Sequence, residues 1–553
     1  MSKGKIKWFS GLFTAYYLTF NFWVIDEVKA QDEEVKTYQD FVKLCETLKE
    51  TQDYENALKA CEEAIAINRN DPKIWTDHAD ILLSLQRYPE ALISYDQVLR
   101  QTPQNSYALT QQCTALLAIN KNEEANETCF QALKVDQNWG NATATQAWYN
   151  RGLAFTRLQE PEEAFYAYEW ATKLNPDYTQ AWTGLCNLEL RLTDYTEALN
   201  YCDRALQTNP EDSASLAQVW LNKARIFKQL KQYGEALNAY TQALSLDAED
   251  PIIWTEQGVI YGLLGKPGDA LVAHNWALEI KADYAQALVN KCAILNRLGQ
   301  YEEAQKTCET ALQESDRNWG DQNEAVAWNQ RGNALTGQNK YEEALVSFQR
   351  AIAINSNYSE PWSNRVVPLW RLGRFDDALA SSERAIALDS NSSLAWYNYG
   401  RILTTQERYD DAVAAYKRAI EGSASFTQQP PLAEIWINQS AVLVRLERYQ
   451  EALTAANNAI AMNPESAKGW YNKAIILVSL KQYQRAVESY DQAIQINPEN
   501  ADFLTGKGIA LRLVGSYAEA LANLQKALEL NPDNALAQEN LEFVQQQMAF
   551  EQP

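Results

Sequence analysis

The sequence predicts an all-α solenoid of about fourteen stacked helical hairpins. An alanine recurs along nearly the whole chain, from Ala57 to Ala520, and nine of the thirteen intervals between successive alanines are 34 residues long. A second alanine follows each of these after seven residues, with Val98 as the one exception. A fixed period of this length indicates one supersecondary unit that is repeated and stacked along an axis.

Residues 145–178 illustrate the unit. Apolar residues at helical spacing predict two helices, over about residues 148–158 and 164–174. Pro161 suits the first turn of the second helix, where no backbone N–H donor is needed. Asn175-Pro176 ends that helix, because the residue before a proline avoids the helical region. Small residues at Gly152, Ala164 and Ala171 allow close approach, so each unit is predicted to be an antiparallel hairpin that stacks on its neighbours.

This pattern resembles the tetratricopeptide repeat (TPR). The resemblance rests on a tryptophan at the fourth position, a small eighth residue, a tyrosine before the second helix, and a closing proline. The tryptophans are Trp75, Trp148, Trp182, Trp220, Trp254, Trp328, Trp362, Trp396, Trp436 and Trp470. The prolines are Pro103, Pro176, Pro210, Pro464, Pro498 and Pro532. The resemblance implies a right-handed superhelical array over residues 38–534, and it implies protein or peptide binding without naming a partner.

Residues 535–553 follow the last repeat and contain the segment LAQENLEFVQQQMAFEQ. A solenoid needs a polar element over its last exposed face. We therefore predict a C-terminal capping helix in this segment.

The charge balance excludes some classes of partner. The 553-residue chain carries a formal net charge of −23. An acidic surface repels phosphate backbones, so nucleic-acid binding is not expected. The same charge disfavours anionic lipid headgroups, which leaves an N-terminal anchor as the only expected contact with a membrane.

Residues 1–30 do not fit the repeat. Three lysines precede an apolar run over residues 8–25, and Val28 and Ala30 occupy the −3 and −1 positions of a cleavage site before Gln31. This pattern is typical of a secretory signal peptide. The alternative is an uncleaved membrane anchor, since eighteen residues can just span a bilayer. Both place the repeats outside the cytoplasm, in a periplasm or a comparable compartment, and with this segment the chain resembles TPR proteins of an exported bacterial type.

The eight cysteines form four couples, each separated by sixteen residues. In every couple the first cysteine takes the small eighth position and the second takes the aromatic twenty-fourth position, on the other helix of the same hairpin. The couples are Cys45 and Cys61, Cys113 and Cys129, Cys186 and Cys202, and Cys292 and Cys308. Cysteine can be a small buried apolar residue, but the pairing predicts four disulfides within repeats. Such bonds persist in oxidising compartments, and no C-x-x-C spacing supports a zinc site.

An asparagine recurs at the sixth position of the first helix, which lines the concave face of a TPR array. The residues are Asn150, Asn222, Asn290, Asn364, Asn398, Asn438 and Asn472. Each side chain offers a donor and an acceptor that suit the backbone of an extended peptide. The alternative is that this asparagine belongs to the general TPR consensus and serves the fold.

Two further features of the repeats are candidate binding elements. The seventh position is basic in seven repeats, and we expect these side chains to pair with carboxylates of adjacent helices; the alternative is a basic stripe that binds an acidic partner. Two insertions share the pattern Asp-x-Asn-Trp-Gly and contain Trp139 and Trp319. These tryptophans are candidate anchors for a partner, or they pack beneath the longer loops.

No catalytic constellation is apparent. The two histidines, His78 and His274, lie in different repeats at framework positions. The sequence lacks a P-loop, an H-E-x-x-H motif and a dinucleotide-binding glycine motif before a helix. We therefore expect no enzymatic activity, no cofactor and no metal.

The function predicted is a non-enzymatic scaffold or adaptor outside the cytoplasm, such as an assembly factor. Its expected partner is a protein or an extended peptide in the concave groove. The alternative is a structural component of an envelope secretion or export complex.

Overall fold

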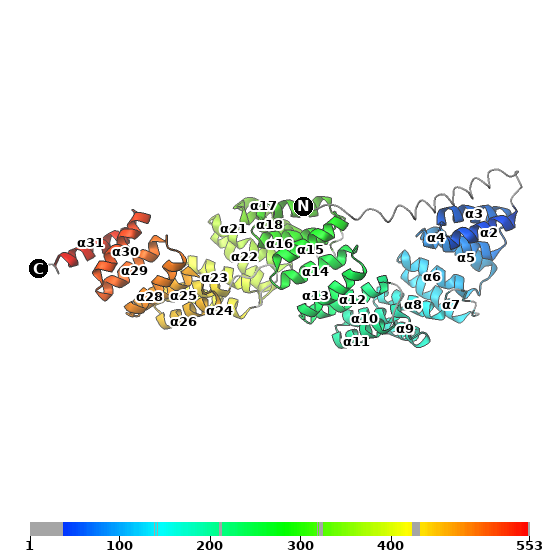
Figure 1. The fold of residues 1–553 in the computed structure, drawn as a ribbon, viewed down its shortest axis with the longest axis horizontal. Helices are drawn as coiled ribbons and strands as arrows, with labels where there is room; N and C mark the ends of the chain where they lie inside the picture. Colours follow the sequence, from blue (N-terminus) through cyan, green and yellow to red (C-terminus); the bar gives the residue numbers. More distant parts are fainter. Residues whose placement is uncertain are drawn as a thin grey trace, which may run out of the picture. The chain divides into compact units, whose positions relative to one another are not determined.

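The chain forms two compact units, Met1–Lys231 and Gln232–Pro553, each with its own packing. The computed structural model describes residues 37–550 except 136, 138, 141, 209–212, 318, 320–323 and 423–431. All elements of regular secondary structure in these residues are α-helices, and consecutive helices pair as hairpins (Figure 1). The all-α prediction is therefore confirmed.

The described part of the first unit contains five hairpins and one further helix. The hairpins are α2 (Tyr38–Glu50) with α3 (Tyr54–Ile67), α4 (Pro72–Ser84) with α5 (Tyr88–Gln101), α6 (Ser106–Ala118) with α7 (Asn122–Lys134), α8 (Ala144–Leu158) with α9 (Pro161–Leu174), and α10 (Thr179–Leu192) with α11 (Tyr195–Gln207). The further helix is α12 (Ser213–Gln229).

The described part of the second unit contains α13 (Tyr233–Leu246), eight hairpins and a last helix. The first four hairpins are α14 (Pro251–Leu263) with α15 (Pro267–Ile280), α16 (Ala285–Arg297) with α17 (Tyr301–Glu314), α18 (Glu324–Gly337) with α19 (Tyr341–Ile354), and α20 (Ser359–Asn364) and α21 (Val366–Arg371) with α22 (Phe375–Leu388). The other four are α23 (Ser393–Thr405) with α24 (Tyr409–Glu421), α25 (Leu432–Arg445) with α26 (Tyr449–Met462), α27 (Ala467–Ser479) with α28 (Tyr483–Ile496), and α29 (Ala501–Val514) with α30 (Tyr517–Leu530). The last helix is α31 (Ala535–Phe550).

The turn within each hairpin has one repeated geometry. In the second hairpin, the Arg87 N–H donates to the Leu82 carbonyl at 2.9 Å, and Gln86 between them has φ of 59°. This hydrogen bond, together with a residue in the left-handed conformation just before the donor, is the Schellman motif that ends many helices. Glycine takes the left-handed position at Gly265, Gly299, Gly373 and Gly515. The turn thus forms with either glycine or a longer residue.

The eighth position is small because an aromatic ring lies directly against it. A Cβ atom added to Gly152 would lie 2.5 Å from the ring of Tyr168, and one added to Gly332 would lie 2.5 Å from Phe348. In both cases the two residues are sixteen apart in the sequence, and both rings are almost fully buried. The helices of a hairpin therefore approach closely only where the eighth residue is small.

The four cysteine couples occupy the same two positions as this glycine and ring. The structure joins Cys45 to Cys61, and likewise the other three couples, with Cα–Cα distances of 5.3, 5.5, 5.2 and 5.6 Å. These distances are normal for disulfides. Each bond replaces the contact between a small residue and a ring, and in the chain-entropy model closing a loop of this length stabilises the fold by about 3 kcal/mol.

The tryptophan at the fourth position fastens the loop that precedes its helix. Five of these indoles donate from Nε1 to the backbone carbonyl six residues earlier, at 2.8 or 2.9 Å. They are Trp75, Trp182, Trp254, Trp396 and Trp470. This recurring hydrogen bond holds the loop between two hairpins against the helix that follows it.

One first helix is broken. It is divided into α20 and α21 at Arg365, three residues before Pro368. Proline has no N–H and cannot donate to the carbonyl four residues earlier, which here belongs to Asn364. The buried Pro368 thus accounts for the interruption.

Helix α31 covers the last hairpin. Its Ala537 and Val544 are fully buried in a cluster with Leu511, Leu524 and Ala527. Among residues 37–550, as far as they are described, no helix is long and apolar enough to cross a membrane. The segment predicted as a signal peptide or anchor, residues 1–30, lies outside the described residues.

We predict that each disulfide stabilises mainly its own hairpin. The double replacement Cys186→Ser and Cys202→Ser should destabilise α10 and α11 by about 3 kcal/mol, because stacked repeats transmit little beyond their neighbours. Amide hydrogen exchange measures the effect helix by helix. The replacement Cys186→Gly with Cys202→Tyr should recover part of the loss by restoring the glycine–ring contact. An equal loss of protection throughout the first unit would contradict the prediction.

We also predict an acid-sensitive region around His274. Burial, with a smaller contribution from Lys291, lowers the pKa of His274 from 6.5 to about 3. Between these values the unfolded chain binds a proton that the folded chain does not bind, so stability falls as the pH falls below 6.5. The loss should reach about 2 kcal/mol at pH 5. His274→Phe, which copies Phe348, should abolish this part of the pH dependence in the amide exchange of α14 and α15, and an unchanged dependence would refute the assignment.

Candidate functional site

The predicted asparagine ladder lies in the contact between consecutive hairpins. Asn222, Asn398, Asn150 and Asn364 are only 0, 2, 4 and 9 % exposed. Asn290, Asn438 and Asn472 are half-buried. A fully buried side chain cannot contact a peptide, so exposure alone separates the seven residues into two groups.

Five of the seven ladder amides donate to the first helix of the preceding hairpin, whereas the Nδ2 atoms of Asn222 and Asn290 have no hydrogen-bond partner among the described residues. Asn398 Nδ2 donates to the Ser363 carbonyl at 2.9 Å, and Asn364 Nδ2 donates to Asn329 Oδ1 at 2.9 Å. Further bonds of this kind join Asn150 to Thr114 Oγ1, Asn438 to the Tyr397 hydroxyl, and Asn472 to the Ile437 carbonyl. These five side chains therefore connect one repeat to the one before it.

The interpretation of the ladder as a ligand site is corrected accordingly. Asn150, Asn222, Asn364 and Asn398 are too buried to contact a partner, and the donors of three of them already have acceptors within the chain. The alternative, that these asparagines belong to the repeat consensus and serve the fold, fits these residues better. The sequence could not decide between the two, because a recurrent asparagine satisfies either requirement equally well.

A second connection between hairpins was missed in the sequence. Arg191 Nη1 donates to the Thr156 carbonyl at 3.2 Å, and Arg297 Nη1 donates to the Gly262 carbonyl at 3.1 Å. Arg157 donates to the Leu117 carbonyl in the same way. Each acceptor lies at the C-terminal end of the preceding first helix, where carbonyls lack intrahelical donors and favour a cation. The available signal was an arginine recurring at the thirteenth position.

The basic seventh position is engaged within the array. Lys223 lies 2.6 Å from Asp203, Arg331 lies 2.9 Å from Glu309, and Lys507 lies 2.6 Å from Asp491. In each pair the carboxylate belongs to the second helix of the preceding hairpin. These three cations thus stabilise the stacking, as expected, and do not form an open basic stripe.

The two inserted tryptophans pack into the core. Trp139 is half-buried against Cys113, Cys129 and Leu116, and Trp319 is half-buried against Leu288 and Ala311. Both indoles thus cover a disulfide-bearing repeat. This arrangement favours the packing alternative over a role as partner anchors.

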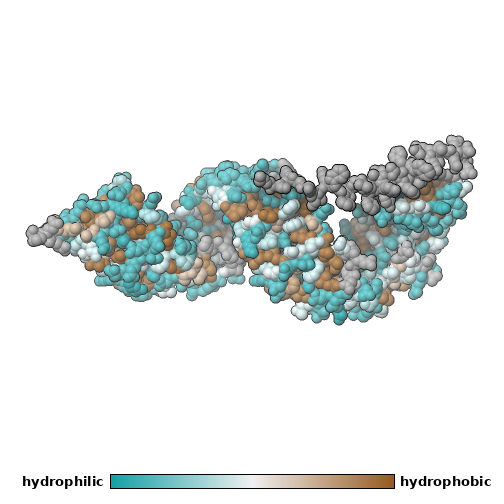
Figure 2. Space-filling view, viewed as in Figure 1, coloured by the Kyte–Doolittle hydropathy of each residue, from teal (hydrophilic) through white to brown (hydrophobic). Residues whose placement is uncertain are grey.

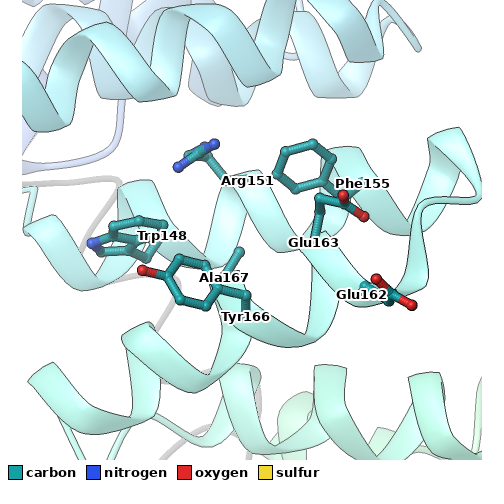
Figure 3. A pocket seen from close by; sticks show the side chains of 7 residues that line it. All are labelled: Trp148, Arg151, Phe155, Glu162, Glu163, Tyr166 and Ala167. Carbon is teal, nitrogen blue, oxygen red and sulfur yellow. The ribbon is translucent and has the colours of Figure 1, made fainter.

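A small pocket lies beside α8 and α9 in the first unit (Figure 3). Trp148 and Tyr166 form one end of it, and Glu162 lies at the other. The Arg151 guanidinium lies 4.7 Å from the Phe130 ring and 5.0 Å from the Trp148 ring, and its Nε donates to Asn126 at 3.0 Å. Because Arg151 already has these contacts to α7, we assign the pocket to the stacking of two repeats.

A second pocket opens on the first-helix face of the last two hairpins. Its volume is about 280 Å³. It is lined by Tyr471, Ile475, Val478, Ser479, Tyr490, Asp502, Thr505, Gly506, Ile509, Asn534 and Leu536. We call this the groove pocket. It is predominantly apolar, and the carboxylate of Asp502 is its only charged group.

The groove pocket exists because the sixth residue of this hairpin is Gly506. A Cβ atom there would lie 2.5 Å from the ring of Tyr490, so a ladder asparagine cannot occupy the position without displacing the ring. The floor of the pocket is therefore an aromatic ring. The sequence signal was a glycine at the sixth position of the last repeat, where seven other repeats have asparagine, together with isoleucine at the ninth position in two successive repeats.

The chemistry of the remaining side chains offers no reactive centre in the described part of the chain. Every cysteine there is in a disulfide. Burial lowers the pKa of His78 to about 4 and that of His274 to about 3, so both are neutral at pH 7. Over the same residues, no group of three or more His, Cys, Asp and Glu side chains could hold a metal ion.

These features define an all-helical repeat scaffold whose side chains serve mainly to join one repeat to the next. The chain belongs to the tetratricopeptide repeat family. Models described as "Tetratricopeptide repeat" or "TPR repeat" match residues 48–112, 145–178, 177–249, 221–288, 283–357, 369–427, 439–501 and 508–548.

Similar proteins are components of protein assemblies. The chain is 23 % identical over 151 residues to anaphase-promoting complex subunit 3 of Schizosaccharomyces pombe, a match that spans 27 % of this chain and only 22 % of that relative. A solved structure, the APC/C hetero-tetramer Cut9-Hcn1, covers 92 % of this chain and 96 % of its own with a TM-score of 0.50 at 16 % identity.

A further solved structure, that of the TPR protein YrrB, is 23 % identical and covers 35 % of this chain and 96 % of its own with a TM-score of 0.30. The Cut9-Hcn1 likeness supports the fold alone. Membership of the family supports a protein-interaction scaffold and favours a non-catalytic role.

We predict that a ladder asparagine contributes to stability and not to ligand contact. Asn398→Ala leaves the Ser363 carbonyl without this donor and should destabilise α20, α21 and α23 by about 1 to 3 kcal/mol. The exposed Asn457 of α26 provides the control, and Asn457→Ala should have no measurable effect. Amide exchange of the three helices measures the difference. Equal protection in both variants would show that the ladder is dispensable for the fold.

Proposed function

We propose that this protein is a non-enzymatic scaffold that acts outside the cytoplasm. It binds an extended segment of a partner protein on the first-helix face of its second unit, and it serves there as an assembly factor. The observation that carries the proposal is the groove pocket, an apolar hollow on a face that the repeat architecture leaves open. Figure 2 shows hydrophobic patches set among hydrophilic surface over the helices of this unit.

The apolar character of the groove pocket is not required by the fold. Ile475 and Ile509 take the ninth position of their first helices, where some other repeats have a polar residue, such as Asp80, Asn187 and Asn333, and others have an apolar one, such as Val259 and Val367. Both isoleucines are half-buried, so part of each side chain is in contact with solvent. Covering the exposed part of such a half-buried side chain contributes about 1 kcal/mol, since burying it completely from water contributes about 1.5 to 3 kcal/mol. A partner that inserts an apolar residue would gain this energy.

The location outside the cytoplasm rests on the cysteines and the N-terminal segment together. All eight cysteines pair within repeats, and disulfides are rare where thiols are kept reduced. Residues 1–30 carry the features of an export signal. Two independent features of the chain therefore support the same compartment.

Photo-crosslinking in the native host tests the groove. A benzophenone amino acid at Ile509 should form specific protein adducts, because that side chain lines the pocket. The control position is Val346 on α19, which is 60 % exposed on a second helix. Ile475→Arg, which copies Arg401 at the matching position, should prevent the adducts. Adducts that appear equally at Val346, or that persist in Ile475→Arg, would refute the groove as the binding site.

Export is tested on natively produced protein. We expect the mature chain to begin at Gln31 and alkylation after denaturation to find no free thiol. Mass mapping should recover the four couples described above. A chain that keeps Met1, remains in the cytosol and carries free thiols would contradict the proposed compartment.

A further inference from the structure

Two guanidinium groups lie over one indole ring in the second unit. The centre of the Arg371 guanidinium is 5.2 Å from the Trp370 ring, and that of Arg401 is 5.1 Å from the same ring. The indole Nε1 donates to Thr405 Oγ1 at 3.1 Å. Arg401 also lies 5.6 Å from the ring of Tyr397. These contacts hold two like charges no more than about 10 Å apart, since each lies about 5 Å from one ring.

Over the described residues, neither arginine has a carboxylate within ion-pair distance. Nearby arginines of the same unit do. Arg374 lies 2.6 Å from Asp377, and Arg408 lies 2.7 Å from Asp411. The Trp370 ring thus brings together two cations that have no carboxylate partner among the described residues. Their mutual repulsion is a cost that an added anion would remove.

Trp370 and Arg401 share a face with the groove pocket. Trp370 takes the twelfth position of its first helix and Arg401 the ninth, and the same positions in α27 are Val478 and Ile475, which line the pocket. Tyr397 likewise matches Tyr471. Since the helices are repeats of one unit within one compact body, equivalent positions face the same side.

We propose that Trp370, Arg371 and Arg401 form a carboxylate-binding subsite for the same partner segment that the groove pocket binds. A guanidinium over an aromatic ring keeps N–H donors free to bind a carboxylate in bidentate fashion. The inference rests on the proposed function, because it names the chemistry of the segment bound in that groove. The partner segment thus has an acidic residue at one end and an apolar residue at the other.

The charge of the chain argues for a carboxylate and against a polyanion. A net charge of −23 repels nucleic acid and anionic lipid surfaces at long range, whereas two guanidiniums suffice for one or two carboxylates. The same geometry gives the distance between the acidic and the apolar residue of the partner segment. Arg401 and Ile475 lie two hairpins apart, about 20 Å at normal helix spacing. An extended segment covers this distance with about six residues.

Selection from a random twelve-residue peptide library tests the inference. The peptides are displayed at the N-terminus of a phage coat protein, so none has a free C-terminus. The full chain is immobilised with its disulfides intact. We expect enriched peptides to contain Asp or Glu about six residues from a large apolar residue.

Matched variants separate the two subsites. Arg371→Gln with Arg401→Gln should reduce binding of an enriched peptide at least tenfold and weaken its salt dependence, because it removes two unpaired cations. Arg374→Gln with Arg408→Gln removes the same charge from existing ion pairs and should leave binding within about twofold. Replacing the acidic residue of the peptide by its amide should reproduce the loss in the wild-type chain only.

The outcomes distinguish this inference from the proposed function. If enriched peptides lose binding in Ile475→Arg but show no acidic preference, the groove remains and the carboxylate subsite is wrong. If no peptide depends on Ile475, both are wrong. If only synthetic peptides with a free C-terminus bind, and their amidated forms do not, the carboxylate comes from a chain end and the side-chain source is excluded.

Discussion

The close contact between the eighth and twenty-fourth residues is the constraint on which the rest of the structure depends. Each hairpin closes because a small residue on one helix accepts a ring, an aliphatic side chain or a sulfur atom from the other. A Cβ atom at Gly400 would lie 2.8 Å from Tyr416, and Cys186 joins Cys202 at the same two positions. This contact sets the distance between the two helices, and that distance decides which side chains reach the next hairpin.

The stacking of hairpins buries polar side chains, which then need hydrogen-bond partners within the chain. Buried amides need partners, since an unmade hydrogen bond is costly. Asn364 and Asn398 find theirs on the preceding first helix, while Arg191 and Arg297 donate to carbonyls at the C-terminal end of such a helix. The inner surface is thus organised by contacts within the chain. At Gly506, where glycine takes the place of the asparagine, and at Arg371 and Arg401 beside Trp370, this surface offers groups that a partner could contact.

The fold was predictable because every repeat carries the same pattern of small, aromatic and turn residues. The break at Pro368 was not predicted, although its cause is one missing N–H. The candidate site was harder to predict from the sequence. Asparagine occupies the sixth position in seven repeats, and such a recurrence fits a ligand site and a structural requirement equally well. The ninth position is polar in some repeats and apolar in others, so Ile475 and Ile509 do not stand out in the sequence, and the pocket they line depends on Gly506 and on the ring of Tyr490.

The sixteen-residue spacing of the cysteines has a consequence for how the chain acquires its bonds. Eight cysteines allow 105 complete pairings. Each cysteine here has its partner on the other helix of its own hairpin, and no bond crosses from one repeat to another. Each couple can therefore be oxidised as soon as a single hairpin has emerged, before the rest of the chain is available to compete. Oxidation in order of synthesis yields the native pattern, and the chain needs little isomerase activity to correct mispaired bonds.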